Sequence, residues 1–264
     1  MFESMNFICY FCTNNLVITH LIPSVMKRIL ILMLCVLAIP CCLMAQSKLP
    51  SVDPRGTFVT VEGEELDDAS SAQSAPLVGH FMANPENVAN FTARYEWTIT
   101  RMTQTSNEVI VHRFDENLDY TFTESGTFAI RLYATFVLGN DTISYPDEGE
   151  DNPIMVSICE SKLEFPNAFT PNGDGYNDVF KAKDGYQSIV SFSASVFNRW
   201  GQKLYSWDSP DGSWDGKYHG SVVNDGVYYL VVAAKGADGR KYNIRKAINV
   251  LTGYDNRSKT GGDE

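Results

Sequence analysis

Short apolar runs separated by turn-forming residues follow an apolar leader and characterise most of the chain. Residues 95–100 alternate polar and apolar side chains with a period of two, which predicts a strand with one buried face. Residues 57–61, 109–111 and 154–158 form further runs of this kind. About seven short strands with turn signals at such spacing predict an immunoglobulin-like sandwich over residues 50–160.

Residues 120–133 are expected to form a strand, a turn and a second strand. Gly126 suits the turn because glycine adopts a positive φ at little cost. The segment Tyr-Glu-Trp at 95–97, followed by the hairpin at 119–132, resembles the polycystic-kidney-disease (PKD) family of extracellular sandwiches. Thr-Ile-Thr-Arg stands where that family has a glycine-rich segment after the tryptophan strand. The resemblance implies that Trp97 is a core residue.

A second all-β module is predicted over residues 162–254. Residues 193–197 and 202–205 are expected to be strands that flank a tight turn, and Gly201 relieves the bend. The long apolar run at 227–234 predicts a central strand that is covered on both faces. Residues 241–251 are expected to supply the last strand.

Four motif blocks occur in order in this second module. They read Phe-Pro-Asn-Ala-Phe-Thr-Pro-Asn-Gly-Asp-Gly-Tyr-Asn-Asp-Val-Phe at 165–180, Val-Phe-Asn-Arg-Trp-Gly-Gln-Lys-Leu-Tyr at 196–205, Trp-Asp-Gly-Lys at 214–217 and Asn-Asp-Gly-Val-Tyr-Tyr-Leu-Val-Val at 224–232. The blocks closely resemble the gliding-motility-associated C-terminal domain, the type B sorting domain of the type IX secretion system. The motif residues are Phe169, Pro171, Asn172, Gly173, Asp174, Gly175, Asn177, Asp178, Phe197, Asn198, Arg199, Trp200, Gly201, Trp214, Asp215, Gly216, Gly226 and Tyr228.

This resemblance implies export in two steps. A signal peptide takes the chain into the periplasm, and the folded C-terminal domain is then read by the outer-membrane secretion machinery, which releases or attaches the protein at the cell surface. In type B domains the sorting information is spread over a folded surface. Trp200 and Trp214 are large apolar groups, and both are expected to plug the ends of a thin sandwich.

The leader at residues 1–45 has the composition of a secretory signal peptide. Met26 precedes Lys and Arg, and an apolar run of about a dozen residues follows. We expect translation to start at Met26 and cleavage to fall between Ala45 and Gln46, which leaves no membrane span in the mature protein. A lipoprotein and an uncleaved anchor are the alternatives. The polar, Gly-rich tail at 255–264 is expected to be disordered.

The net charge and the positions of the cysteines bear on the partners and on the source of stability. The net charge is −11, and an acidic protein repels phosphate backbones, so we expect no nucleic-acid partner. Five of the six cysteines lie in the first 42 residues. Cys159 has no partner for an internal disulfide in the mature chain, so the two folds must depend on core packing.

One loop carries candidate metal ligands. Asn172, Asp174 and Asp178 place oxygen side chains around glycines, and the carbonyl of Tyr176 could complete a calcium site. The alternative is a cluster of Asx turns that holds the entry to the next strand by local hydrogen bonds. Residues 211–215 form a weaker second candidate.

We find no apparatus for catalysis, and we predict that the protein is not an enzyme. His20 lies in the leader, and His80, His112 and His219 lack the spacing of zinc ligands. Cys159 is expected to be a buried, inert thiol in an apolar strand.

Residues 141–143 form a candidate glycosylation site. The triplet Asp-Thr-Ile resembles a periplasmic O-glycosylation signal, with Thr142 as the acceptor.

The sequence thus predicts an all-β protein with two immunoglobulin-like sandwich modules in tandem after a signal peptide. Its expected function is non-enzymatic: the second module directs type IX secretion and surface attachment, and the PKD-like module serves adhesion or envelope structure, with a surface glycan or protein as partner. We expect a monomer. The alternatives are an envelope-assembly protein that stays inside the outer membrane and a polysaccharide-binding accessory module.

Overall fold

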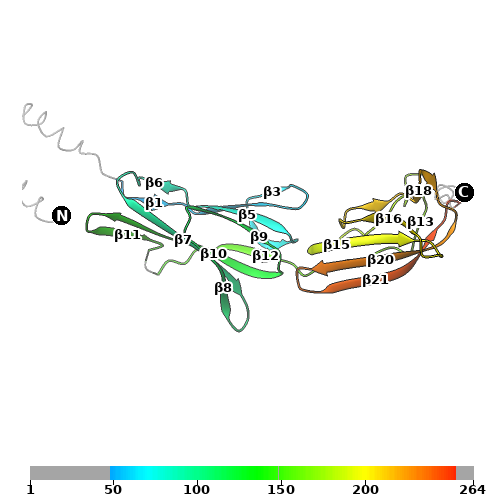
Figure 1. Ribbon diagram of the computed structural model, residues 1–264. Coiled ribbons are helices and arrows are strands. Elements are labelled where there is room, and N and C mark those ends of the chain that lie inside the picture. The colour runs from blue at the N-terminus through cyan, green and yellow to red at the C-terminus, as the bar shows by residue number, and fades with distance from the viewer. Residues whose placement is uncertain (1–47, 148, 254–264) are drawn as a thin grey trace, which may run out of the picture. The chain divides into compact units, whose positions relative to one another are not determined.

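The computed structural model describes residues 48–147 and 149–253, and every regular element among them is a β-strand (Figure 1). The predicted all-β class is confirmed. The leader, the cleavage position between Ala45 and Gln46 and the tail at 255–264 lie outside the described residues.

Two sheets form the first sandwich. One sheet has the order β3-β2-β5-β9. The other has the order β4-β12-β10-β7-β8, and β11 pairs with the C-terminal part of β10. A short ladder of β1 and β6 adjoins them. The bounds are β1 (Ser51–Val52), β2 (Arg55–Val59), β3 (Glu65–Leu66), β4 (Ala69–Gln73), β5 (Leu77–Met82), β6 (Pro85–Glu86), β7 (Thr92–Met102), β8 (Asn107–Arg113), β9 (Asn117–Phe122), β10 (Gly126–Leu138), β11 (Asp141–Tyr145) and β12 (Ile154–Ile158).

Trp97 lies at the centre of the first core and is fully buried, as predicted. Its indole packs 6.1 Å from the ring of Phe81, which in turn contacts Phe58 and Phe122 edge to face. The indole N–H donates to the carbonyl of Glu116 at 3.1 Å, so the one polar atom of the side chain is satisfied. Trp97 therefore contributes to stability and presents no platform to a ligand.

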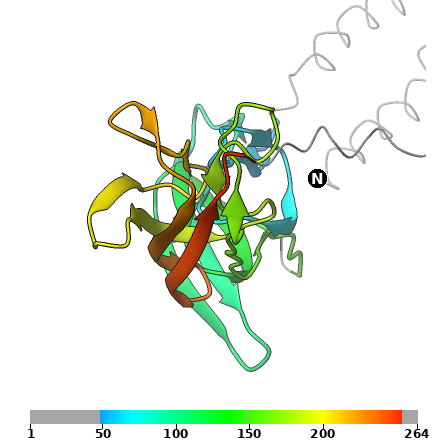
Figure 2. The ribbon, with the colours of Figure 1, turned by 90° about the vertical axis from the view of Figure 1, so that its right-hand side faces the viewer.

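The hairpin predicted at 119–132 is wrong, although its strands and turn are present. Residues 117–138 form a strand, a turn and a strand, but β9 pairs with β5 in one sheet and β10 pairs with β7 in the other, because the chain crosses between the sheets at this turn. Gly126 begins β10 with a φ of 137°. The β7–β8 hairpin extends beyond the rest of its sheet (Figure 2). Val109 in β8 and Phe114 just after it are more than half exposed.

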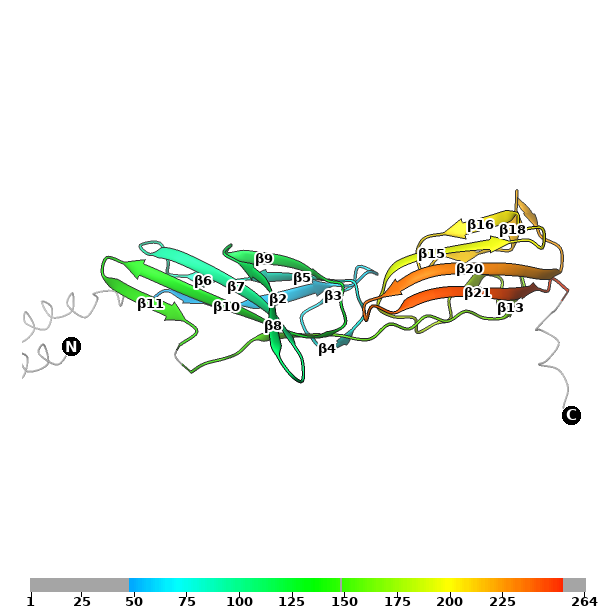
Figure 3. The same cartoon turned by 60° about the horizontal axis from the view of Figure 1, so that its bottom comes forward.

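The second sandwich is built on one five-stranded sheet of order β13-β21-β20-β15-β16 (Figure 3). Two short ladders, β14-β17 and β18-β19, and the connecting loops supply the rest. The bounds are β13 (Ala168–Phe169), β14 (Phe180–Lys181), β15 (Ile189–Phe197), β16 (Lys203–Trp207), β17 (Ser213–Trp214), β18 (Lys217–Tyr218), β19 (Ser221–Val222), β20 (Gly226–Gly236) and β21 (Lys241–Val250).

The prediction that residues 227–234 are covered on both faces is wrong. β20 is central in its sheet, but its side chains alternate between buried and exposed. Leu230 and Val232 face the core, whereas Tyr229 and Val231 face solvent. The physical reason is that an antiparallel sheet can leave one face in water, and here no second layer covers that face within the described residues.

Hydrogen bonds join the two sandwiches. The described residues from Pro50 onward belong to one compact unit. The Ser188 hydroxyl accepts from the Ala75 amide at 3.2 Å, and the Ser74 hydroxyl accepts from the Ser188 amide at 2.6 Å. The Ser125 amide donates to the carbonyl of Ala237, which is itself part of the first core. Fully buried Ser188 is thus a structural residue that the sequence pattern did not identify.

We predict that Gly79→Ala destabilises the first sandwich. A Cβ at this position of β5 would lie 2.9 Å from the Phe81 ring and 3.2 Å from the Phe122 ring, and both rings are fully buried. Overpacking of this kind costs about 1–3 kcal/mol, so thermal unfolding should begin several degrees lower. Differential scanning calorimetry measures the change.

Gly253→Ala is the matched control, because a Cβ there meets nothing within 4 Å. Equal melting curves for the two variants would show that the core near Gly79 relaxes without cost.

Candidate functional site

The loop between β13 and β14 contains most of the first motif block. Its backbone amides converge on the carboxylate of Asp178. Asp178 accepts hydrogen bonds from the backbone amides of Asn172, Gly173 and Gly175, at 3.1, 2.7 and 2.8 Å. Glycine is required at 173 and 175, where φ is 78° and 90°. The loop therefore winds around Asp178, whose two oxygens each hold part of the backbone.

Two further groups brace the same loop. The Asp174 carboxylate accepts from the Tyr176 amide at 2.8 Å, and the Asn172 side-chain oxygen accepts from the Asp174 amide at 3.1 Å. The Tyr176 carbonyl accepts from the Thr170 hydroxyl at 3.0 Å. The four predicted metal ligands thus lie together, and each engages hydrogen bonds within the loop. This geometry is that of an Asx-turn cluster.

Among the described residues, no group of three or more His, Cys, Asp or Glu side chains is arranged to hold a metal ion. In the second candidate segment, Asp211 contacts the Ser209 hydroxyl, whereas Asp215 pairs with the Lys217 ammonium at 3.0 Å. A calcium site at 172–178 is the alternative to the Asx-turn cluster.

The second motif block forms the turn between β15 and β16. The Asn198 side-chain oxygen accepts from the amides of Trp200 and Gln202, each at 3.0 Å, and Gly201 has a φ of 79°. The expectation that Trp200 plugs the sandwich is wrong, because its side chain is 75% exposed at the tip of this turn. The guanidinium of Arg199 stacks over the indole at 4.3 Å, which covers one ring face by a cation–π contact.

The third and fourth blocks meet the first in the core. Trp214 is fully buried and packs 5.3 Å from Phe169 and 5.7 Å from Tyr228, and its N–H donates to the Lys217 carbonyl. A Cβ at Gly216 would lie 2.8 Å from the ring of Pro171, so this position must be glycine. Here Trp214 plugs the end of the sandwich, as predicted for it.

Two aspartates fix the ends of strands near this cluster. Burial opposes ionisation of Asp215, but hydrogen bonds from Lys217 and its positive charge lower the pKa of the carboxyl. Hydrogen bonds from the side chain and the backbone of Thr252 lower the pKa of Asp225, with its carboxylate 2.7 Å from the Thr252 amide. Asp225 therefore ties the end of the last strand to the start of β20, next to Gly226.

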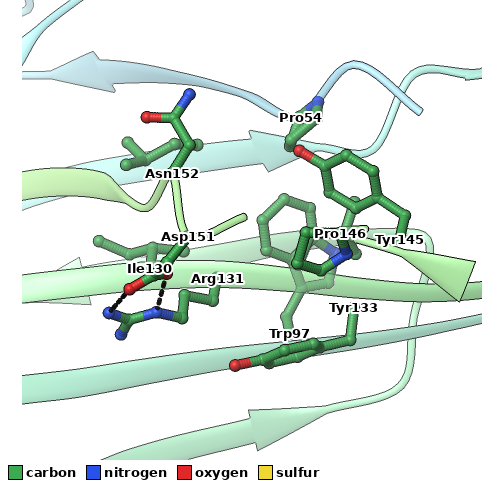
Figure 4. A pocket seen from close by; sticks show the side chains of 11 residues that line it. Pro54, Trp97, Ile130, Arg131, Tyr133, Tyr145, Pro146, Asp151 and Asn152 are labelled. Carbon is green, nitrogen blue, oxygen red and sulfur yellow. Dashed lines mark hydrogen bonds and ion pairs between the residues drawn. The ribbon is translucent and has the colours of Figure 1, made fainter. Parts of the chain in front are cut away.

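A small pocket lies beside Trp97 in the first sandwich, as Figure 4 shows. Its volume is about 20 Å³, and Trp97, Tyr145 and Pro146 form part of the lining. The Arg131 guanidinium closes one side through two hydrogen bonds to Asp151, at 2.7 and 2.9 Å. Such a volume holds one water molecule and no organic ligand.

The remaining candidate residues are spread over the chain. His80 and His112 each contact a carboxylate, Asp119 and Glu96 respectively, at 2.7 Å. Thr142 is exposed on β11, so an acceptor role stays a prediction.

The prediction of a buried Cys159 in a strand is corrected. The residue follows β12 and is half-buried, with its sulfur 3.1 Å from the Ser188 hydroxyl.

These contacts join the four motif blocks into one folded module. Residues 163–248 match the family model described as the CHU_C Type IX secretion signal domain. The second sandwich is therefore similar to type IX secretion signal domains over nearly all of its length. The match does not extend to the first sandwich, for which the PKD-like assignment stays a prediction.

Comparisons with curated proteins and with solved structures give no further evidence on function. No curated protein matches the chain. A solved structure titled "Crystal structure of tetra-tandem repeat in extending region of large adhesion protein" aligns at 12% identity, covering 78% of this chain and 68% of that one, with a TM-score of 0.27. Overlap this low supports no argument about function. Within the described residues, none of the elements is a helix long and apolar enough to cross a membrane.

We predict that Asp178→Ala loosens the loop and destabilises the second sandwich. The substitution leaves three backbone amides without their acceptor on a half-buried carboxylate. Charge-assisted bonds are among the stronger kind, so we expect a loss of about 1–3 kcal/mol in the free energy of unfolding. Urea titration of the purified mature protein measures it. Asp184→Ala, which removes a carboxylate that is 92% exposed, serves as the control and should be neutral.

A second prediction concerns calcium at the same loop. Because the backbone already occupies the Asp178 carboxylate, we expect the melting temperature to be equal in millimolar Ca²⁺ and in excess chelator. A rise in Ca²⁺ that Asp178→Ala abolishes would show that the loop is a calcium site.

Proposed function

We propose that this chain is an exported, non-enzymatic protein whose second sandwich directs type IX secretion and attachment to the cell surface. The observation that carries the proposal is the match of residues 163–248 to the type IX secretion signal domain. The folded geometry supports it, because the motif blocks come together as turns and core contacts of one module. A signal that consists of a folded surface requires such a module.

The first sandwich is proposed to be a PKD-like module that serves adhesion or envelope structure, with a protein or a surface glycan as its contact. Its pocket beside Trp97 is too small for an organic ligand, so this pocket is not the proposed contact. The exposed apolar side chains Val109 and Phe114, on and after the extended β8, offer such a contact. An envelope-assembly role inside the outer membrane is the competing proposal.

Removal of residues 162–264 tests the sorting role in the native organism. We expect the intact protein outside the outer membrane and the truncated protein trapped inside it, because the truncated chain lacks the domain that the machinery reads. Cell fractionation and protease shaving of whole cells distinguish the two locations.

A fusion controls for misfolding of the truncated chain, because the first core loses Ala237 on truncation. Residues 159–264 joined to a periplasmic passenger protein with its own signal peptide should carry that passenger outside. If the intact protein also remains inside the outer membrane, the sorting role is wrong and the second sandwich is an assembly domain.

A further inference from the structure

One face of the five-stranded sheet in the second sandwich is exposed, and we call it the outer face. Side chains alternate along its strands, and cross-strand pairs such as Phe197–Tyr229 and Tyr229–Ala247 place outward residues side by side. The outer face consists of Ser191, Ser193, Ser195, Phe197, Lys203, Ser206, Val227, Tyr229, Val231, Ala233, Lys235, Lys241, Asn243, Arg245, Ala247 and Asn249. Figure 3 shows the strands β15, β20 and β21 that carry it.

The outer face is positively charged and has no carboxylate. None of the strands β13, β15, β16, β20 and β21 contains Asp or Glu. Lys203, Lys235, Lys241 and Arg245 are all exposed on it, and none of the four forms an ion pair within the described residues.

Four of the seven other cations of the second sandwich are neutralised by a carboxylate. Lys181, Lys183, Lys217 and Arg240 each pair with a carboxylate of the same sandwich. Seven cations of residues 161–253 form no ion pair within the described residues, and four of them share the outer face; the other three are Lys162, Arg199 and Lys246.

The composition of the chain makes this surface unusual. Residues 48–160 carry 6 basic and 19 acidic side chains, whereas residues 161–253 carry 11 basic and 9 acidic ones. The cationic face therefore occurs in a protein that is strongly acidic overall, with a net charge of −11. Such a face attracts carboxylates and disfavours partners with exposed cations.

An apolar stripe runs through the cations. Val227, Tyr229 and Val231 on the central strand are 48%, 46% and 38% exposed. The stripe continues across the sheet through Phe197, which directly precedes the turn that bears exposed Trp200 and its stacked Arg199. Aromatic residues and arginine with adjoining apolar groups are the composition of protein–protein contact centres.

We propose that the outer face is the surface by which a protein of the secretion machinery recognises the sorting domain, and that this partner presents carboxylates around an apolar patch. The inference rests on the proposed function and specifies its recognition surface. A protein partner fits better than an anionic polymer, because a polymer would use the cations and leave the exposed Val–Tyr–Val stripe without a contact. The four cations supply steering and selectivity, and the stripe with Trp200 supplies buried area.

Charge reversal on the full-length protein in the native organism tests the proposal. The variant Lys235→Glu, Lys241→Glu, Arg245→Glu places like charges against the partner, so we expect secretion to fall about tenfold or more, with the protein accumulating inside the outer membrane. The matched control is Lys162→Glu, Lys181→Glu, Lys183→Glu, which makes the same change in net charge at exposed positions off the outer face. The control should be secreted at the level of the unmodified protein.

The apolar stripe is tested separately by Tyr229→Thr with Val231→Thr, which keeps residues that favour strands. We expect reduced secretion for this variant too. Melting curves of each purified variant must match that of the unmodified protein, so that a loss of secretion reflects recognition and not misfolding.

The outcomes separate the recognition surface from the sorting role. If deletion of residues 162–264 blocks export while both outer-face variants are secreted normally, the inference is wrong and the sorting role stands. If deletion has no effect on location, the sorting role itself fails. Variants that are secreted normally but detach from the cell surface would assign the face to a surface polymer, and loss of a dimer in sedimentation with normal secretion would assign it to a second copy. Either result overturns the proposal.

Discussion

Both sandwiches depend on large aromatic side chains buried in thin cores, because no disulfide is possible within residues 48–253, where Cys159 is the only cysteine. Trp97 in the first core and Trp214 in the second are completely buried, and each indole N–H has a backbone acceptor. Rings of this size exclude more water per residue than aliphatic side chains do. They therefore stabilise domains whose sheets bury only one face each.

This constraint explains what most of the motif residues do. Phe169, Trp214 and Tyr228 pack together, and Gly216 is small enough for Pro171 to approach. Asp178 and Asn198 each bind several amides of their own loop or turn. Such residues specify the shape of the module, whereas direct contact with a partner requires side chains that leave the core. Of the motif tryptophans, Trp200 is the one that does so.

The two sandwiches differ in the charge of their surfaces. The first carries most of the negative charge, and the second presents a cationic face around an apolar stripe. The hydrogen bonds of Ser188 and the insertion of Ala237 into the first core couple the two modules within one unit.

Local sequence pattern determined the class of fold, the strands on either side of Gly126 and Gly201, and the four motif blocks, because period-two alternation and glycine turns are encoded by neighbouring residues. The resemblance to PKD-like sandwiches implied that Trp97 lies in the core, and the structure buries it completely. The pattern failed for Trp200 and for the run at 227–234, because hydrophobicity alone does not say whether a second layer covers a face. The bonds of Asp178 to three amides of its own loop are local, but the sequence left them as one of two alternatives beside a calcium site. Only the tertiary structure decided that Ser188 is buried at the join and that four cations share one face, since both depend on strand register and on contacts between residues far apart in the chain.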